Sequence, residues 1–373
     1  MAVVKPFRAV RYNTARAGPL QALVAPPFDV IDPAERERYI ASDRHNVVRL
    51  TLPDSEGEAA RELAAWQREG ILVRDEGPAF WWLSQDFAGP DGARRTRTGF
   101  VASVRVEPYA AGAIRPHERT HECPKAGRLR LLRATRMELE PIFLLYEDES
   151  AAPRRALEPL AAGEPLMEAA DSGVTSRLWR VDDPEALAAV EAALADLPLL
   201  IADGHHRYET ALAFHEEDSS LESEYAMAAL VNTVGEGLTI FPTHRVVQRL
   251  GEVEGTEVPG GPLGTLARLD SLDREHPAAV LYRGGKAYLV RGSTAGELDA
   301  AFLERFRPEG VSYTPRAEEA VARVDEGEAE AAFLLRAPTI EQVTAVAAAG
   351  EVMPPKSTYF YPKLLSGLLF LPV

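Results

Sequence analysis

A short run of chemically active side chains, Asp203-Gly204-His205-His206-Arg207, follows the apolar stretch from Leu197 to Ala202. Glycine permits a tight turn. A helix that starts after such a turn directs its first amides and the positive end of its dipole outward. The guanidinium group of Arg207 has paired N–H donors whose geometry matches phosphate oxygens. The spacing therefore predicts a strand, a glycine turn and a helix that together bind an anion, phosphate above all.

Each residue of this run has a candidate role. The carboxylate of Asp203 could hold a Mg²⁺ ion that bridges phosphates, because Mg²⁺ usually takes one or two protein carboxylates. His205 and His206 could donate hydrogen bonds to phosphate or move a proton. Asp203 and the two histidines are thus catalytic candidates, and Gly204 to Arg207 are candidates for binding phosphate or nucleotide. A simpler alternative stays open, in which Asp203 only caps the helix and Arg207 pairs with Glu209.

A second run, His117-Glu118-Arg119-Thr120-His121, fits the His-Glu-x-x-His pattern of zinc hydrolases. That pattern needs both histidines on one face of a continuous helix, with the glutamate as general base. Pro124 leaves little helix after His121, although Glu138 or Glu140 could supply a third ligand. We favour Glu118 as a general base that deprotonates a substrate hydroxyl beside the phosphate loop, with zinc-dependent hydrolysis as an alternative.

Weaker candidates for substrate binding carry a charge, an imidazole or a hydroxyl near these motifs or near a predicted strand end. They are His117, Thr120, Lys125, Arg128, His244, Arg245 and Lys356.

Charge and composition limit the classes of partner that we expect for this protein. The 373 residues include 41 lysines and arginines against 57 acidic residues, a net charge of -16, which disfavours nucleic acid. The single cysteine, Cys123, fits a reducing compartment. The first residues lack the apolar core of a signal peptide, and no apolar run reaches the ~18 residues of a membrane span. We expect a soluble cytoplasmic protein with small-molecule partners and leave open a homo-oligomer.

Apolar periodicity predicts alternating strands and helices. Strands are expected at residues 47–52, 80–83, 98–104, 141–146, 178–181 and 197–202, helices at 59–69 and 184–195, and a hairpin at 279–290. Asp183 before Pro184 is a predicted N-cap. The expected fold is mixed α/β, with an N-terminal α+β domain (1–110), a phosphate-binding core (111–250) and a C-terminal α/β domain (251–373).

Several of these segments resemble known families. His117-Glu118, Pro141-Ile142 and residues 201–207 resemble, in order, segments of the ParB-like free-serine kinases. This resemblance implies a ParB-like core, Glu118 as general base and a nucleotide phosphate held by Asp203 to Arg207.

Nearly the whole chain also resembles the domain-of-unknown-function 1015 family, a resemblance that identifies relatives but no reaction. The motifs that carry it are Pro6-Phe7, residues 25–30, residues 117–120, the His-His loop and residues 356–363.

The chain departs from these relatives at Lys125-Ala126-Gly127-Arg128, where they often carry Lys-Glu-Asp-Arg, so two carboxylates are missing. The function that we expect is transfer of a phosphoryl group between a nucleotide (ATP, ADP or CTP) and a small hydroxyl metabolite such as serine, with Mg²⁺. The alternative from another class is a nucleotide-binding switch without turnover. Whether the two motifs share one cleft stays open.

Overall fold

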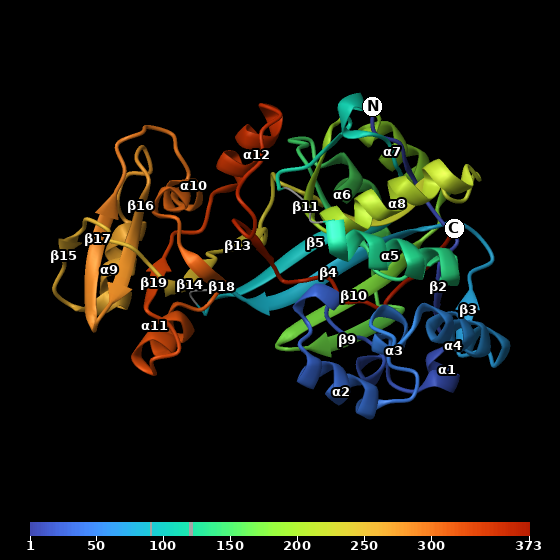
Figure 1. Ribbon diagram of the computed structural model, residues 1–373. Coiled ribbons are helices and arrows are strands. Elements are labelled where there is room, and N and C mark those ends of the chain that lie inside the picture. The colour runs from blue at the N-terminus through green and yellow to red at the C-terminus, as the bar shows by residue number, and fades with distance from the viewer. Residues whose placement is uncertain (90–91, 119–121) are drawn as a thin grey trace. The chain divides into compact units, whose positions relative to one another are not determined.

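A computed structural model describes residues 1–89, 92–118 and 122–373 of the chain (Figure 1). The chain folds into two compact units. The first unit contains Met1–Pro116, Thr120–Leu238 and Pro362–Val373, and the second contains His117–Arg119 and Thr239–Tyr361. None of the helices described is long and apolar enough to cross a membrane.

A nine-stranded mixed sheet forms the centre of the first unit. Its order is β6 (Ile114–Arg115), β11 (Leu199–Asp203), β8 (Ile142–Tyr146), β12 (Tyr225–Asn232), β5 (Arg94–Arg105), β4 (Phe80–Ala88), β10 (Val174–Val181) and β9 (Met167–Asp171), with β1 (Val4–Lys5) paired to β5. The pairs β11–β6 and β12–β8 are parallel, and the other pairs of this sheet are antiparallel. Two short pairs accompany it, β2 (Val10–Tyr12) with β3 (Leu72–Arg74) and β7 (Met137–Glu138) with β21 (Leu371–Pro372).

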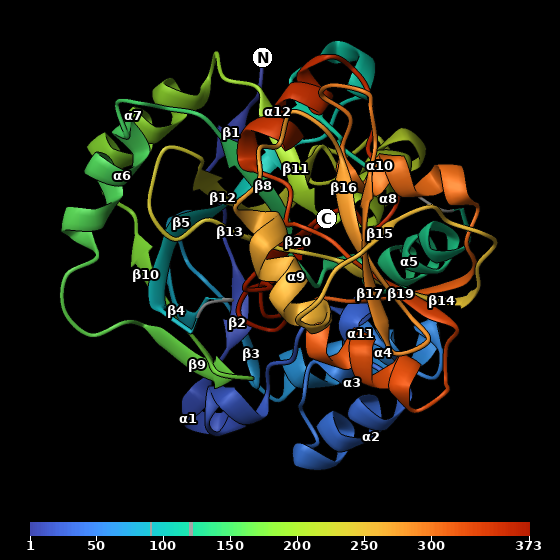
Figure 2. The ribbon, with the colours of Figure 1, turned by 90° about the vertical axis from the view of Figure 1, so that its left-hand side faces the viewer.

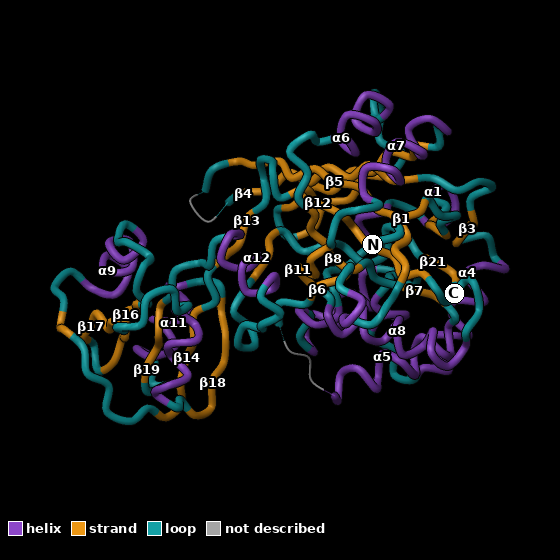
Figure 3. The backbone as a smooth tube through the Cα atoms, turned by 90° about the horizontal axis from the view of Figure 1, so that it is seen from above, coloured by secondary structure: helices purple, strands orange, loops and turns teal. Residues whose placement is uncertain are grey.

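Helices of the first unit surround this sheet (Figure 3). They are α1 (Thr14–Ala17), α2 (Pro33–Ser42), α3 (Val48–Thr51), α4 (Glu56–Arg68), α5 (Glu122–Thr135), α6 (Ala152–Leu157), α7 (Pro184–Leu194) and α8 (His205–Asp218). Alternate residues of the central strands, such as Phe100 and Leu144, form one core with Val190 of α7 and Tyr208 of α8. The sheet therefore fixes where α8, and the turn that precedes it, must lie.

The second unit has a six-stranded antiparallel sheet (Figure 2). Its order is β15 (Thr256–Glu257), β17 (Lys286–Arg291), β16 (Ala278–Arg283), β19 (Ala331–Leu334), β14 (His244–Arg249) and β18 (Glu309–Thr314). Its helices are α9 (Gly261–Asp270), α10 (Asp299–Leu303), α11 (Ala317–Asp325) and α12 (Ile340–Ala348), and β13 (Thr239–Phe241) pairs with β20 (Tyr359–Tyr361). Two apolar clusters take alternate residues of the sheet, one with Phe302 of α10 and the other with Ala320 of α11.

Most predicted elements are confirmed within a few residues, including the mixed α/β fold. β4 and β5 form the predicted antiparallel hairpin, although residues 90–91 of its loop lie outside the described residues. Asp183 accepts a hydrogen bond from the Ala186 amide, as expected of an N-cap. The boundaries at residues 110 and 250 stay a prediction, and the nine-stranded sheet takes strands from both sides of residue 110.

The strand predicted at residues 47–52 is wrong, because this segment contains the one-turn helix α3. The buried Asn46 side chain accepts a hydrogen bond from the Val48 amide (3.0 Å) and donates to the Ala22 carbonyl (2.9 Å). These bonds fix a helical start. A short buried apolar run cannot be assigned to strand or helix by periodicity alone.

Gly99 of β5 is a test of this packing, because a Cβ there would lie 2.4 Å from the Leu230 carbonyl oxygen of β12. We expect Gly99→Ala to lower the free energy of unfolding by roughly 1–3 kcal/mol through overpacking. Gly127→Ala in α5 is the matched control. Its nearest neighbour would be 3.9 Å away, so higher helix propensity should raise stability by up to about 1 kcal/mol. Urea unfolding measures both, and equal effects would contradict the packing argument.

Candidate functional site

The turn between β11 and α8 has the predicted geometry. Gly204 takes a left-handed conformation, with φ 90° and ψ 30°, and stands at the N-cap of α8. A Cβ on Gly204 would lie 2.9 Å from the Arg207 Nε atom, so the glycine allows the arginine to fold back over the turn. The first amides of any helix have no acceptor within the helix. The turn therefore brings such amides next to a guanidinium group.

The carboxylate of Asp203 lies between two cations. Lys363 donates from its Nζ atom to Oδ1, and Arg207 donates from Nη2 to Oδ2 over 2.5 Å. Arg207 also donates from Nη1 to the Pro141 carbonyl. Burial alone would raise the pKa of Asp203, but the charges of Lys363 and Arg207 hold this pKa well below its usual value. Asp203 is therefore an ionised bridge, rather than the helix cap of the simpler alternative.

Arg97 of β5 is a further cation near Asp203 that the sequence analysis missed. Its side chain is buried and donates to Gln85 Oε1 over 2.5 and 3.1 Å and to the Pro362 carbonyl over 2.7 Å. Its guanidinium lies 4.5 Å from the centre of the Phe143 ring. Burial lowers the pKa of Arg97 to about 9, and the charge of Asp203 opposes this shift. Nothing in the sequence distinguishes Arg97 from the neighbouring Arg94 and Arg95.

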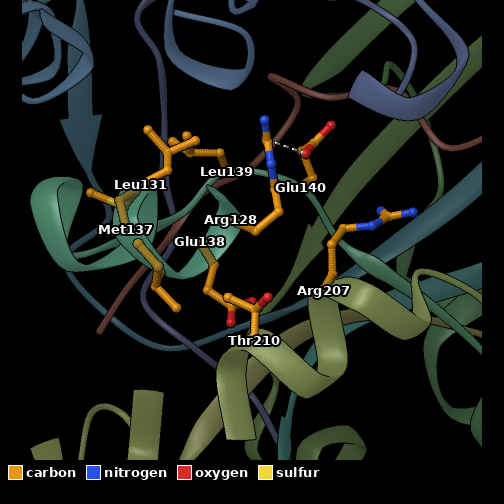
Figure 4. A pocket seen from close by; sticks show the side chains of 9 residues that line it. Arg128, Leu131, Met137, Glu138, Leu139, Glu140, Arg207 and Thr210 are labelled. Carbon is orange, nitrogen blue, oxygen red and sulfur yellow. Dashed lines mark ion pairs between the residues drawn. The ribbon is translucent and has the colours of Figure 1, made fainter. Parts of the chain in front are cut away.

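A cavity of about 50 Å³ lies beside α8 (Figure 4). It is lined by Arg128, Leu131, Leu132, Met137, Glu138, Leu139, Glu140, Arg207 and Thr210. Arg128 lies 3.6 Å from Glu140 and 3.8 Å above the Phe28 ring. Arg128 is thus held beside α8, the helix that begins at the phosphate-loop candidate.

Glu138 and Glu140, considered above as third zinc ligands, both have partners in the first unit. Glu140 Oε1 accepts hydrogen bonds from the Phe28 amide and the Ser366 hydroxyl, each 2.9 Å long. Glu138 accepts from the Met227 amide over 2.8 Å. Burial raises the pKa of Glu138 to about 8, so this carboxyl is largely protonated at neutral pH.

The second unit holds Glu118 and several of the weaker candidates. Glu118 Oε1 accepts a hydrogen bond from the Lys356 backbone amide over 3.1 Å, and the Lys356 residue has a left-handed φ of 56°. Arg245 is buried and donates to the Thr243 carbonyl over 3.1 Å. Burial lowers the pKa of Arg245, and the charge of Glu118 is among those that oppose this shift. Glu118 and Arg245 thus interact electrostatically within one unit.

Two buried histidines of the second unit have structural partners. His117 Nε2 lies 2.9 Å from the Thr358 hydroxyl. His244 Nδ1 accepts from the Leu335 amide over 3.1 Å, and burial lowers the pKa of His244 to about 4. His244 is therefore neutral at physiological pH. The partners of both histidines thus belong to the same unit.

The predicted residues fall into two groups. The first unit brings Asp203 to Arg207 together with Lys125, which lies 3.5 Å from Glu209 of α8, and with Arg128. The second unit brings together His117, Glu118, His244, Arg245 and Lys356. Thr120 and the zinc-motif residue His121 lie outside the described residues. Within the described parts of the chain, no group of three or more His, Cys, Asp or Glu residues could hold a metal ion.

Fold and site together define a mixed α/β protein with a glycine turn between a buried strand and a helix. The family model described as Protein of unknown function (DUF1015) matches residues 4–301, and the chain belongs to this family. The family resemblance of the sequence motifs is thus confirmed.

Several solved structures are distantly similar to the chain. Free serine kinase in complex with AMP is 15% identical, over 69% of this chain and 89% of that chain, with a TM-score of 0.39. A conserved hypothetical protein from Pyrococcus furiosus is 16% identical over 69% and 93%, with a TM-score of 0.37. SbnI with a C-terminal truncation from Staphylococcus aureus is 12% identical over 71% and 85%, with a TM-score of 0.38. No curated protein matches the chain.

Replacing Glu138 by Gln tests the electrostatics of the cavity. Between the ordinary pKa of 4.5 and about 8, the folded chain binds one more proton at this site than the unfolded chain. The free energy of unfolding therefore falls as pH rises through this window. Glutamine keeps an acceptor for the Met227 amide but does not titrate. Relative to wild type, E138Q should gain stability of the order of a few kcal/mol from about pH 5 to about pH 8.

Urea unfolding at a series of pH values measures this difference. Glu217→Gln, on an exposed part of α8, is the control, and its effect should stay constant over the window. A constant difference for E138Q would show that the Glu138 carboxyl is already ionised in the folded protein.

Proposed function

We propose that the chain is a nucleotide-dependent phosphotransferase that acts on a small hydroxyl metabolite. The observation that carries this proposal is the Gly204 turn, where the start of α8 lies next to Arg207 and Lys363. Such a turn combines helix amides, a helix dipole and cations, the features that hold phosphate oxygens. The nucleotide, ATP, ADP or CTP, comes from the motif resemblance to free-serine kinases, and serine is the first acceptor to test.

Each residue of the loop has a place in this proposal. Gly204 gives the turn its shape, Arg207 provides positive charge, and His205 and His206 donate hydrogen bonds to the bound phosphate. Both histidines lie at the start of α8 and are partly exposed, so a ligand can reach them. Asp203 acts through Arg207 and Lys363, which it orients.

Glu118 is the proposed general base. The Lys356 amide fixes one of its oxygens, and Arg245 lies within electrostatic reach. The acceptor hydroxyl attacks the terminal phosphorus, its proton passes to Glu118, and the bond from phosphorus to the leaving phosphate oxygen breaks with its electron pair. We assign to the buried Arg245 the binding of a polar group of the acceptor. The mechanism requires that Glu118 reach the phosphate held by the loop.

Magnesium is the cofactor that phosphoryl transfer implies, and Asp203 was its expected ligand. The residues present do not fit this role, because both carboxylate oxygens already accept hydrogen bonds from cations. A divalent ion at Asp203 would have to displace a lysine or an arginine. No step of the proposed reaction therefore passes through a metal at Asp203.

A second candidate is a nucleotide-binding switch without turnover. The segment Lys125 to Arg128 favours it, because the motif resemblance implies two carboxylates where this chain has Ala126 and Gly127. The two cations that remain there are paired with Glu209 and Glu140 of the same unit. If the missing acids serve catalysis, binding would persist and transfer would not.

Transfer from phosphate-labelled ATP, ADP or CTP to serine and related small alcohols tests the function. We expect E118Q to lower turnover by about 10²–10⁴-fold with nearly unchanged nucleotide affinity, because a base contributes this much. H206A should weaken nucleotide binding, while the matched control His215→Ala, at the far end of α8 beside Ser223, should not.

The other functions give different results. Tight nucleotide binding without product from any acceptor would replace the enzyme by the switch. Zinc-dependent peptide cleavage that is lost on replacing His121, with no nucleotide binding, would replace both by a hydrolase.

A further inference from the structure

The position of Lys363 carries an inference about how the site neutralises phosphate. Lys363 comes 160 residues after Asp203 in the sequence and donates to Oδ1 of its carboxylate. Arg207 occupies Oδ2. The lysine side chain is 14% exposed, so this ion pair is largely shielded from water. A shielded pair keeps more of its electrostatic strength than an exposed one.

The backbone on both sides of this lysine side chain is held by the central sheet. Arg97 of β5 donates to the carbonyl of Pro362 over 2.7 Å, and Gln85 of β4 donates to the carbonyl of Lys363 over 3.5 Å. Gln85 in turn accepts from Arg97 and donates to Ser176 of β10 over 3.1 Å. Three adjacent strands thus fix the backbone from which the ammonium group reaches Asp203.

Several cations gather around Asp203. Lys363, Arg207, His205 and Arg97 interact electrostatically with this carboxylate. Glu140 and Asp29 in turn interact with Arg207. Arg97 carries a buried Nη1 atom for which the described residues supply no hydrogen-bond acceptor. A buried cationic group without an acceptor is costly unless an anion compensates it. Such a cluster attracts phosphate and repels a divalent cation.

We propose that Lys363 takes, at Asp203, the place that a divalent cation takes in other phosphotransfer sites, and that Arg97 positions it. Phosphate at this turn is then bound by the ammonium of Lys363, the guanidinium of Arg207 and the helix amides, without a metal on Asp203. Asp203 keeps the two cations apart and oriented. This inference deepens the proposed function and rests on it for the identity of the natural ligand, but anion binding and metal exclusion are testable without turnover.

Pyrophosphate binding in EDTA is the first test. Calorimetry should detect binding to the full-length wild type, and K363M should bind about ten- to a hundredfold more weakly, the usual cost of losing one hydrogen bond to a charged group. K363R keeps the charge, so its affinity for pyrophosphate should stay close to that of wild type. This variant shows whether K363M acts through the loss of charge. The matched control is Lys286→Met, which breaks the exposed ion pair with Glu257 and should change nothing.

Mn²⁺ binding, followed by electron paramagnetic resonance without any nucleotide, is the second test. Wild type and D203N should bind the same amount. K363M should gain a site, because Asp203 loses its lysine, and K363M/D203N should lack it. R97K should show part of this gain if Arg97 positions the lysine, a change that a purely structural role would not produce.

Two results would overturn the inference. One is a Mn²⁺ site in wild type that D203N removes. The other is pyrophosphate binding that is absent from wild type in EDTA or unchanged in K363M. Failure of the proposed function looks different, because transfer would be absent while metal-free pyrophosphate binding and its loss in K363M remained.

Discussion

The ion pairs of Asp203 connect three distant parts of the first unit. Its carboxylate receives Lys363 from the last residues of the chain and Arg207 from the first turn of α8, and Arg207 also binds the carbonyl of Pro141 before β8. This carboxylate therefore links the turn and the start of α8 to the C-terminal segment. Removing its charge would leave two shielded cations without a common partner, which is costly.

Cations gather at this site, although the chain as a whole is acidic. The net charge of -16 opposes the approach of a nucleotide. Short-range contacts at the turn must therefore supply the affinity, and these are less sensitive to salt than long-range attraction. An acidic surface also discourages polyanions such as nucleic acid, whose binding depends on many exposed cations. Both features favour the proposed ligand, a small anion that fits among buried cations.

Local features of the site could be predicted from the sequence, and partners across the fold could not. The strand, Gly204 and α8 follow from residues adjacent in sequence, and so does the Asp183 cap. Lys363 lies within the family motif at residues 356–363, but its pairing with Asp203 depends on how the C-terminal segment returns to the sheet. In the sequence, Arg97 does not differ from Arg94 and Arg95. Its burial follows from the pairing of β4 with β5. The helix α3 depends on the buried bonds of Asn46, which no periodicity reveals.

The two motifs belong to different units. In the proposed function, one unit binds phosphate and the other supplies the general base. The loop from Asp203 to Arg207 and its cation Lys363 belong to the first unit, and Glu118 with Arg245 belongs to the second. The proposed phosphate binding needs only contacts within the first unit. Transfer additionally needs the base, because proton removal requires hydrogen-bond reach to the acceptor. The proposed enzyme and the alternative switch therefore use the same binding loop. They differ in whether Glu118 comes within hydrogen-bond reach of the bound ligand.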